Sequence, residues 1–192
     1  MAMRVLLVDE DQERAETLSE TLSKAGHQIV GHFREAIDLV SRVREARPDV
    51  IIIDHDSPDH DTIEHVCMVT RDDPRPIVMF TQDREGLMIR EALKAGVSAY
   101  VVDGLAPERL RPILEVAVAR FEQCHALRQE LDEARASLAE RKVIERAKGF
   151  LMKQRACGEE EAYRLLQKAA MDGNKRLVEV AEQLVAMSKL LA

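Results

Sequence analysis

The 192-residue chain contains no tryptophan, few other aromatic residues and only three cysteines. Cys67, Cys124 and Cys157 are widely spaced and form no Cys-x-x-Cys pair, which argues against both a disulfide framework and a zinc site. The longest apolar runs are far too short to cross a bilayer, and the amino terminus lacks the pattern of a secretory signal peptide. We therefore expect a cytoplasmic protein with reduced thiols and no membrane contact.

Negative charge is in excess overall, but it is unevenly distributed along the chain. The net charge is −7. Residues 141–192 contain 11 Lys and Arg against 7 Asp and Glu, so this part carries +4 and the rest of the chain carries −11. The length suits one domain of ordinary size plus a smaller module. The sequence thus predicts an acidic domain that is joined to a basic tail.

Short β-branched runs alternate with helix-like segments over the first 120 residues. The runs span residues 5–8, 28–30, 50–53, 77–80 and 100–102, and the segments between them have apolar residues at helical spacing. Strands that are apolar at nearly every position are buried on both faces. The alternation therefore predicts an α/β domain over residues 1–120, with a five-stranded parallel sheet that is doubly wound, with helices on both sides.

A long helix is predicted from about residue 113 to residue 153, because proline is absent there and glycine is nearly so. Spacings of three and four residues, typical of a coiled-coil seam, connect Cys124, Leu127, Leu131, Ala134 and Leu138. One interpretation is a helix that packs on its own domain. Continuity with helices on both sides favours the other interpretation, a coiled-coil linker over residues 113–140 in a parallel homodimer.

The basic tail is predicted to be a small three-helix bundle over residues 138–192. The end of the long helix supplies the first helix, and residues 159–171 and 177–190 supply the others. Cys157-Gly158 precedes an acidic first turn, and Asp172-Gly173-Asn174 breaks the chain again.

Acidic residues directly follow two of the predicted strands. Asp9 and Glu10 follow the first strand, Asp54 follows the third, and Thr81 follows the fourth. The carboxyl ends of parallel strands meet at one edge of a sheet, so these side chains should share a crevice. Clustered carboxylates suit Mg²⁺, and a carboxylate can act as nucleophile toward a phosphoryl donor. Asp54 would be that nucleophile, and the Thr81 hydroxyl would donate to a phosphoryl oxygen.

Four motifs in this part of the chain match a known family. They are Val8-Asp9-Glu10, Asp54-x-x-Ser57-Pro58, Phe80-Thr81 and Tyr100. Through them residues 3–120 resemble the receiver domains of response regulators, which have a flavodoxin-like fold. The resemblance implies that Asp54 is the phosphoacceptor, and that Asp9, Glu10 and Asp54 form a Mg²⁺ site with help from the carbonyl of Asp56.

The resemblance also implies that Tyr100 is the aromatic switch residue, and it identifies one departure. The family has a lysine after the fifth strand, where its ammonium pairs with the phosphoacceptor. Here the matching residue is Asp103. A carboxylate there would repel a phosphoryl group instead of clamping it.

Basic residues dominate residues 141–155. Arg141, Lys148 and Arg155 are seven residues apart and share one helical face, with Lys142, Arg146 and Lys153 nearby. Such a surface could neutralise nucleic-acid phosphates, although a solvated helix face is the ordinary explanation of a charge run.

The tail carries a second set of matching residues. They are Ile144, Ala147-Lys148-Gly149, Leu151-Met152, Glu160-Glu161-Ala162-Tyr163, Leu166, Ala170-Met171 and Val180-Ala181. Through them residues 138–188 resemble the ANTAR module of certain transcription antiterminators. The resemblance implies binding to paired stem-loops in leader RNA, which keeps a terminator from forming. Lys148 is the first candidate for an RNA contact, and the others are Arg146, Lys153, Arg155, Tyr163, Arg164, Lys168, Lys175 and Arg176.

The whole arrangement resembles the NasT type of nitrate-assimilation regulator, with Asp103-Gly104-Leu105 and residues 111–117 strengthening the likeness. This implies control of nitrate and nitrite assimilation genes, with a nitrate-sensing partner protein that holds the regulator inactive. We expect an antiterminator and not an enzyme, because the chain shows no catalytic constellation outside the pocket. Two alternatives remain: activation by a histidine kinase through Asp54-driven dimerisation, or a tail that binds duplex DNA or protein.

Overall fold

The computed structural model describes residues 2–55, 60–82, 84, 86–102 and 107–190. The chain divides into two compact units, residues 1–125 and residues 126–192. In the described part of the chain, no helix combines the length and the apolar character needed to cross a membrane.

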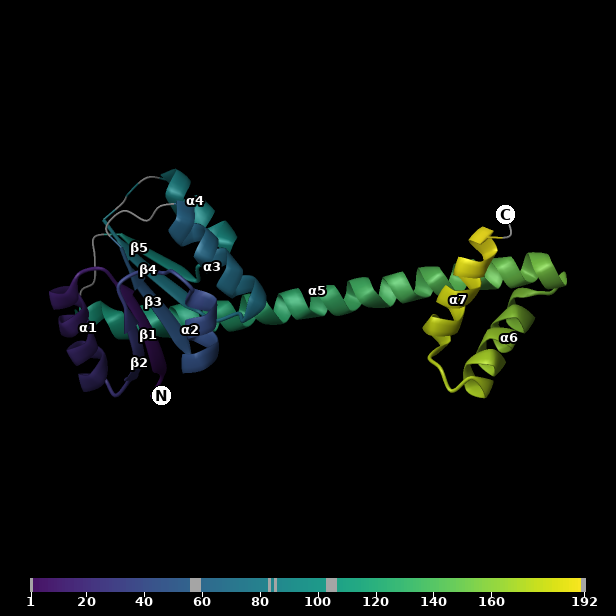
Figure 1. Cartoon of the computed structure of the whole chain (residues 1–192), viewed down its shortest axis with the longest axis horizontal. Coiled ribbons are helices and arrows are strands. Elements are labelled where there is room, and N and C mark those ends of the chain that lie inside the picture. The colour runs from purple at the N-terminus through teal and green to yellow at the C-terminus, as the bar shows by residue number, and fades with distance from the viewer. Residues whose placement is uncertain (1, 56–59, 83, 85, 103–106, 191–192) are drawn as a thin grey trace. The chain divides into compact units, whose positions relative to one another are not determined.

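The first unit is built on a parallel sheet with the strand order β2-β1-β3-β4-β5 (Figure 1). Its strands are β1 (Arg4–Asp9), β2 (Gln28–Phe33), β3 (Val50–Asp54), β4 (Ile77–Thr81) and β5 (Ala99–Val102). Each lies where an apolar run predicts a strand, so the five-stranded parallel sheet is confirmed. The central strands are buried on both faces, as their continuous apolar runs require.

Two hydrophobic cores form on opposite faces of the sheet. Side chains alternate between the faces of a strand, so Val8, Ile51 and Ile53 face one core while Leu7 and Ile52 face the other. The first core is closed by α2 (Leu39–Ala46), α3 (His60–Asp72) and α4 (Gly86–Ala95). The second is closed by α1 (Gln12–Lys24) and by the first turns of α5 (Pro107–Arg155).

Helix α5 begins at Pro107, six residues before the predicted start, and it contains Pro112 near its amino-terminal end. Leu110 and Leu114 flank this proline and are buried against the sheet. Tertiary packing of this turn therefore outweighs the helix-breaking effect of the proline.

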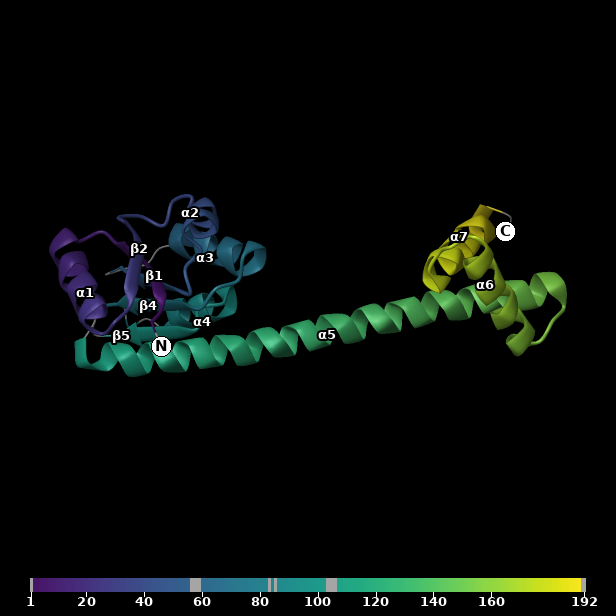
Figure 2. The ribbon, with the colours of Figure 1, turned by 90° about the horizontal axis from the view of Figure 1, so that it is seen from below.

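The second unit is a small helical bundle. The end of α5 packs with α6 (Glu159–Asp172) and α7 (Leu177–Leu190), as Figure 2 shows. Its core consists of small and branched side chains, namely Ala147, Leu166, Ala170, Val180 and Ala181. The three predicted helices of the tail are confirmed within one or two residues of their expected bounds.

Candidate functional site

The acidic pocket lies where β1 and β3 end. These neighbouring strands are in register so that Asp9 pairs with Asp54, and both residues are buried, with 0% and 3% of their surface exposed. Thr81 ends β4 and is also buried. Because the chain leaves β1 toward one side of the sheet and β3 toward the other, this is the topological switch point of the fold.

Arg14 lies in this pocket, although nothing in the sequence motifs indicated it. Its Nη2 lies 2.9 Å from Asp9 Oδ1, and its Nε lies 3.2 Å from both Asp9 oxygens. The same Nε lies 3.4 Å from Asp54 Oδ2. One guanidinium therefore spans both buried carboxylates.

Local structure at the start of α1 positions this arginine. Asp11 is the N-cap residue, and its side chain accepts a hydrogen bond of 3.1 Å from the Arg14 backbone N–H. The Asp11 backbone N–H in turn donates to Asp9 Oδ1 at 2.9 Å. Arg14 thus stands in the first turn of the helix that follows β1, within reach of the strand ends.

Glu10 does not join the two buried carboxylates. Its side chain is half-exposed, and its Oε1 lies 3.9 Å from Nδ1 of His55. Receiver domains in general bind Mg²⁺ beside the phosphoacceptor, but here Arg14 already holds the Asp9 oxygens that such an ion would need. No group of three or more metal-ligating side chains comes together among the described residues. The arrangement therefore does not fit a resident Mg²⁺ ion.

Tyr100 lies on β5, where it is half-buried against the core that α2, α3 and α4 close. Its strand position beside β4 pairs it with Met79. Asp103, which replaces the family's lysine, lies outside the described residues, as does Asp56.

In the tail, Lys148 has an internal role. Only 7% of its surface is exposed, and its Nζ lies 2.6 Å from Oε1 of Glu145 and 2.7 Å from Oε1 of Glu159. Hydrogen bonds to Glu145 and Glu159 raise the pKa of Lys148, and the bond from Lys148 lowers the pKa of Glu159. Its ammonium thus links α5 with α6 in the free chain, and an RNA contact by Lys148 stays a prediction.

The other basic candidates are exposed at the surface of the tail. Two of them are engaged in ion pairs: Arg164 with Glu160 at 2.5 Å, and Arg176 with Glu140 at 2.6 Å. Lys175 donates to Gln183 at 3.3 Å. Six basic side chains of the tail form no ion pair with a carboxylate of the described residues. They are Arg141, Lys142, Arg146, Lys153, Arg155 and Lys168.

Three of these cations lie along one stripe of α5. Lys142, Arg146 and Lys153 follow one another after four and seven residues, so they project from the same side of the helix. Gly149 lies on the stripe between them, and a Cβ at this position would meet no atom within 4 Å. The glycine is therefore not required by packing, and it leaves the helix backbone uncovered between basic side chains.

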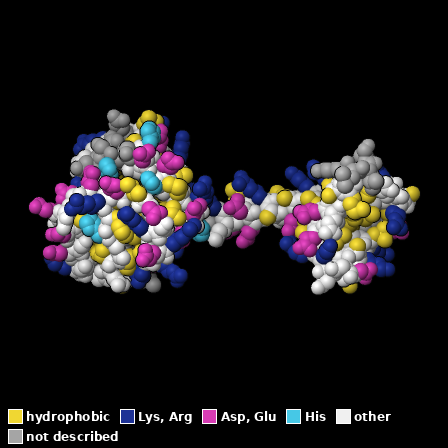
Figure 3. All heavy atoms as spheres, in the orientation of Figure 1, with side chains coloured by type: hydrophobic (Ala, Val, Ile, Leu, Met, Phe, Trp, Pro, Cys, Tyr) yellow, Lys and Arg dark blue, Asp and Glu magenta, His cyan; other side chains and the backbone are white. Residues whose placement is uncertain are grey.

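Tyr163 on α6 is partly exposed, and its ring centroid lies 6.0 Å from Nζ of Lys148. Phe150 is only half-buried. The segment of α5 that precedes the tail core shows hydrophobic side chains at its surface (Figure 3). Leu127, Leu131 and Leu138 of the expected seam are 59%, 49% and 57% exposed.

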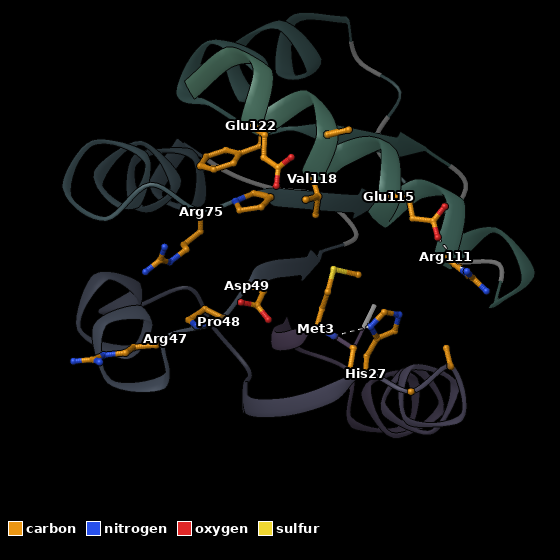
Figure 4. A pocket seen from close by; sticks show the side chains of 16 residues that line it. Met3, His27, Arg47, Pro48, Asp49, Arg75, Arg111, Glu115, Val118 and Glu122 are labelled. Carbon is orange, nitrogen blue, oxygen red and sulfur yellow. Dashed lines mark hydrogen bonds and ion pairs between the residues drawn. The ribbon is translucent and has the colours of Figure 1, made fainter. Parts of the chain in front are cut away.

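A cavity of about 800 Å³ lies at the other end of the sheet, where the strands begin (Figure 4). His27, Asp49 and Arg75 line it together with Arg111 and Glu115 of α5. Burial lowers the pKa of His27, whose Nδ1 accepts a hydrogen bond from the Met3 N–H. Basic and acidic side chains both line this cavity, and it is separate from the Asp54 pocket.

Comparisons with known proteins match both units. The model of the response regulator receiver domain matches residues 5–115, and the model of the ANTAR domain matches residues 132–185. The transcriptional regulatory protein PdtaR of Mycobacterium tuberculosis is 32% identical over 179 residues, which cover 93% of this chain and 87% of that protein.

Two further similar proteins match a shorter part of the chain. The chemotaxis protein CheY of Thermotoga maritima is 27% identical over 57% of this chain and 92% of its own length. The receiver domain of a modulated diguanylate cyclase from Desulfovibrio desulfuricans superposes with a TM-score of 0.57, at 21% identity, over 64% of this chain and 98% of that structure. This last likeness concerns the fold alone.

Proposed function

Because the chain belongs to the family of response regulators in which a receiver domain is followed by an ANTAR domain, we propose that it is an RNA-binding transcription antiterminator. Its tail binds paired hairpins of a leader RNA, and its receiver controls this binding. The observation that carries the proposal is the stripe of exposed cations on α5, which consists of Lys142, Arg146 and Lys153 and has no carboxylate partner among the described residues.

The stripe suits the backbone of a folded RNA. A row of cations along a helix neutralises successive phosphates and releases their counterions. Gly149 removes the side chain that would otherwise keep a phosphate or ribose away from the helix. Arg155, Lys168 and the exposed part of Tyr163 could add phosphate contacts and base stacking around the stripe. We rank three basic residues lower as candidate RNA contacts, because each already has a polar partner within the tail. They are Arg164, Lys175 and Arg176.

A parallel homodimer would present two copies of the tail to two hairpins. The exposed leucines at positions 127, 131 and 138 support it, because a second copy would bury them in a coiled-coil seam. Arg128 and Glu130 flank this seam and give it the polar rim that is typical of a coiled coil. Two linked binding sites raise the affinity for a paired target without any new contact.

Control of nitrate and nitrite assimilation genes is the finer proposal. It is supported by the sequence likeness at residues 111–117, and it includes a nitrate-sensing partner that docks on the receiver and holds the protein inactive. A second candidate is activation by a histidine kinase. The position of buried Asp54 at the end of β3, next to the strand that ends with buried Thr81, favours this candidate. The position of Arg14 opposes it, because its guanidinium lies 3.4 Å from one oxygen of the Asp54 carboxylate and would hinder the approach of a phosphoryl group.

A direct binding measurement tests the proposed function. The purified full chain should bind a two-hairpin leader RNA in moderate salt, and hairpin RNA should compete for it better than duplex DNA of equal length. Failure to bind the RNA contradicts the proposal. Preference for duplex DNA would instead assign the tail to DNA recognition. The DNA-binding response regulator MtrA is similar to this chain over only 57% of the chain and 48% of its own length. This likeness therefore does not support DNA binding by the tail.

A further inference from the structure

The receiver pocket needs a cation for physical reasons. Asp9 and Asp54 occupy paired positions on neighbouring strands, and both carboxylates are almost completely buried. Two ionised carboxylates in such positions repel each other, and each loses its hydration on burial. Unless a positive charge compensates them, the end of the sheet is destabilised.

Arg14 supplies that charge from within the chain. Its Nε and Nη2 both contact Asp9, at 3.2 and 2.9 Å, and Nε also approaches Asp54 at 3.4 Å. A guanidinium stays protonated at every physiological pH, and its planar fork matches the two oxygens of a carboxylate. The capped first turn of α1 fixes the backbone from which the side chain reaches the pocket.

A divalent ion would have to displace this side chain. Mg²⁺ requires near-octahedral coordination at about 2.0 Å and gives up its water reluctantly. The arginine is attached to the same domain, so its effective concentration at the carboxylates is high. We propose that Arg14 takes the place of the divalent cation in the receiver pocket, so that the wild-type chain binds Mg²⁺ only weakly.

The consequence for regulation rests on the proposed function, in which the receiver is the control domain. Because the compensating cation belongs to α1, the position of that helix, and not a metal ion, decides whether the charges of Asp9 and Asp54 are compensated. A protein that docks on the receiver and moves α1 would uncover both carboxylates. RNA binding by the tail is a separate property, so its loss or presence does not decide the identity of the pocket cation.

Isothermal titration of the full chain with MgCl₂ tests the assignment. Arg14→Met should bind Mg²⁺ at least about tenfold more tightly than the wild type, because the competing charge is gone. Its thermal midpoint should rise with added MgCl₂, whereas that of the wild type should not. Arg34→Met is the matched control. Arg34 directly follows β2 and donates to Gln12 at 2.9 Å, without a contact to Asp9 or Asp54.

Equal Mg²⁺ affinity of the wild type and Arg14→Met would overturn the assignment, and so would an equal gain in Arg34→Met. If Arg14→Met does not fold, nuclear magnetic resonance of the wild type decides. The Arg14 Nε–H signal should remain unchanged in millimolar MgCl₂, and a shift that saturates with Mg²⁺ would show that the ion displaces the side chain. Wild-type binding of the hairpin RNA, measured in parallel, reports on the proposed function alone.

Discussion

Lys148 Nζ lies 2.7 Å from Glu159 Oε1 and connects α5 to the first turn of α6. This contact predicts how the tail responds to pH. Because the pKa of Glu159 is lowered in the folded tail, the stabilisation is present above its ordinary value of 4.5 and is lost as the pH falls through the folded value. Because the pKa of Lys148 is raised, its share is present below 10.5 and is lost as the pH rises through the folded value.

Glu159→Gln should therefore lower the melting midpoint of the tail unit near neutral pH, and this difference from the wild type should vanish in acid. Calorimetry of the full chain at several pH values measures both effects. Lys153→Met is the control, because Lys153 lies on the same helix without a carboxylate partner in the described tail, and it should leave the midpoint unchanged. A difference between Glu159→Gln and the wild type that persists in acid would contradict the prediction.

The basic stripe predicts a change in salt dependence. Replacing Arg146 by Gln should weaken RNA binding about equally for different hairpin sequences, and it should reduce the slope of log affinity against log salt by about 1, because one phosphate contact is lost. Fluorescence anisotropy over a salt series measures this slope. Arg71→Gln removes an exposed arginine of α3 in the receiver and should change nothing. An unchanged slope for Arg146→Gln would place the RNA elsewhere.

Gly149 allows stability and binding to be separated. Gly149→Ala should stabilise the tail by about 0.5–1 kcal/mol, because alanine loses less backbone entropy in a helix and finds open space for its Cβ. The same methyl group would block close approach of the RNA backbone, so the affinity should fall. Melting and RNA titration of one sample decide both points. A variant that is more stable and binds RNA as tightly as the wild type would exclude Gly149 from the interface.

Much of the receiver could be predicted because its determinants are local. The first, third and fourth strands are apolar runs that end in a candidate site residue, and parallel pairing then brings Asp9 and Asp54 together. Arg14 was missed for the opposite reason. In the sequence it is one charged residue at a helix start, and its second partner lies 40 residues away. No local pattern separates such a residue from a solvated surface arginine.

Lys148 illustrates the same limit in the tail. Its spacing from Arg141 and Arg155 places the three residues on one helical face, and that much is correct. The burial of Lys148 depends on α6, which returns along α5 and brings Glu159 to its ammonium. Helical periodicity describes one helix by itself, so it cannot tell which part of a basic face a later helix covers.

The exposed leucines of α5 predict the oligomeric state. Leu131→Asp should convert a dimer to a monomer, because a buried pair of carboxylates would replace a pair of apolar side chains in the seam. Sedimentation equilibrium measures the mass. Ala136→Asp introduces the same charge on the opposite side of the helix and should leave the dimer intact. A wild type that is monomeric at high concentration, or equal effects of the two variants, would contradict the proposed seam.

Asp54 provides the test of how the receiver is controlled. The arginine against its oxygen and the absence of the family's lysine at position 103 both oppose phosphoryl transfer to it. Incubating the wild type with a small phosphoryl donor and Mg²⁺ should therefore give no phosphoryl mass shift in intact mass spectrometry. Asp54→Asn should bind RNA within about twofold of the wild type, because the amide keeps the size of the carboxylate and the tail is untouched. A mass shift that Asp54→Asn abolishes, together with tighter RNA binding by the modified wild type, would show instead that phosphorylation switches this protein.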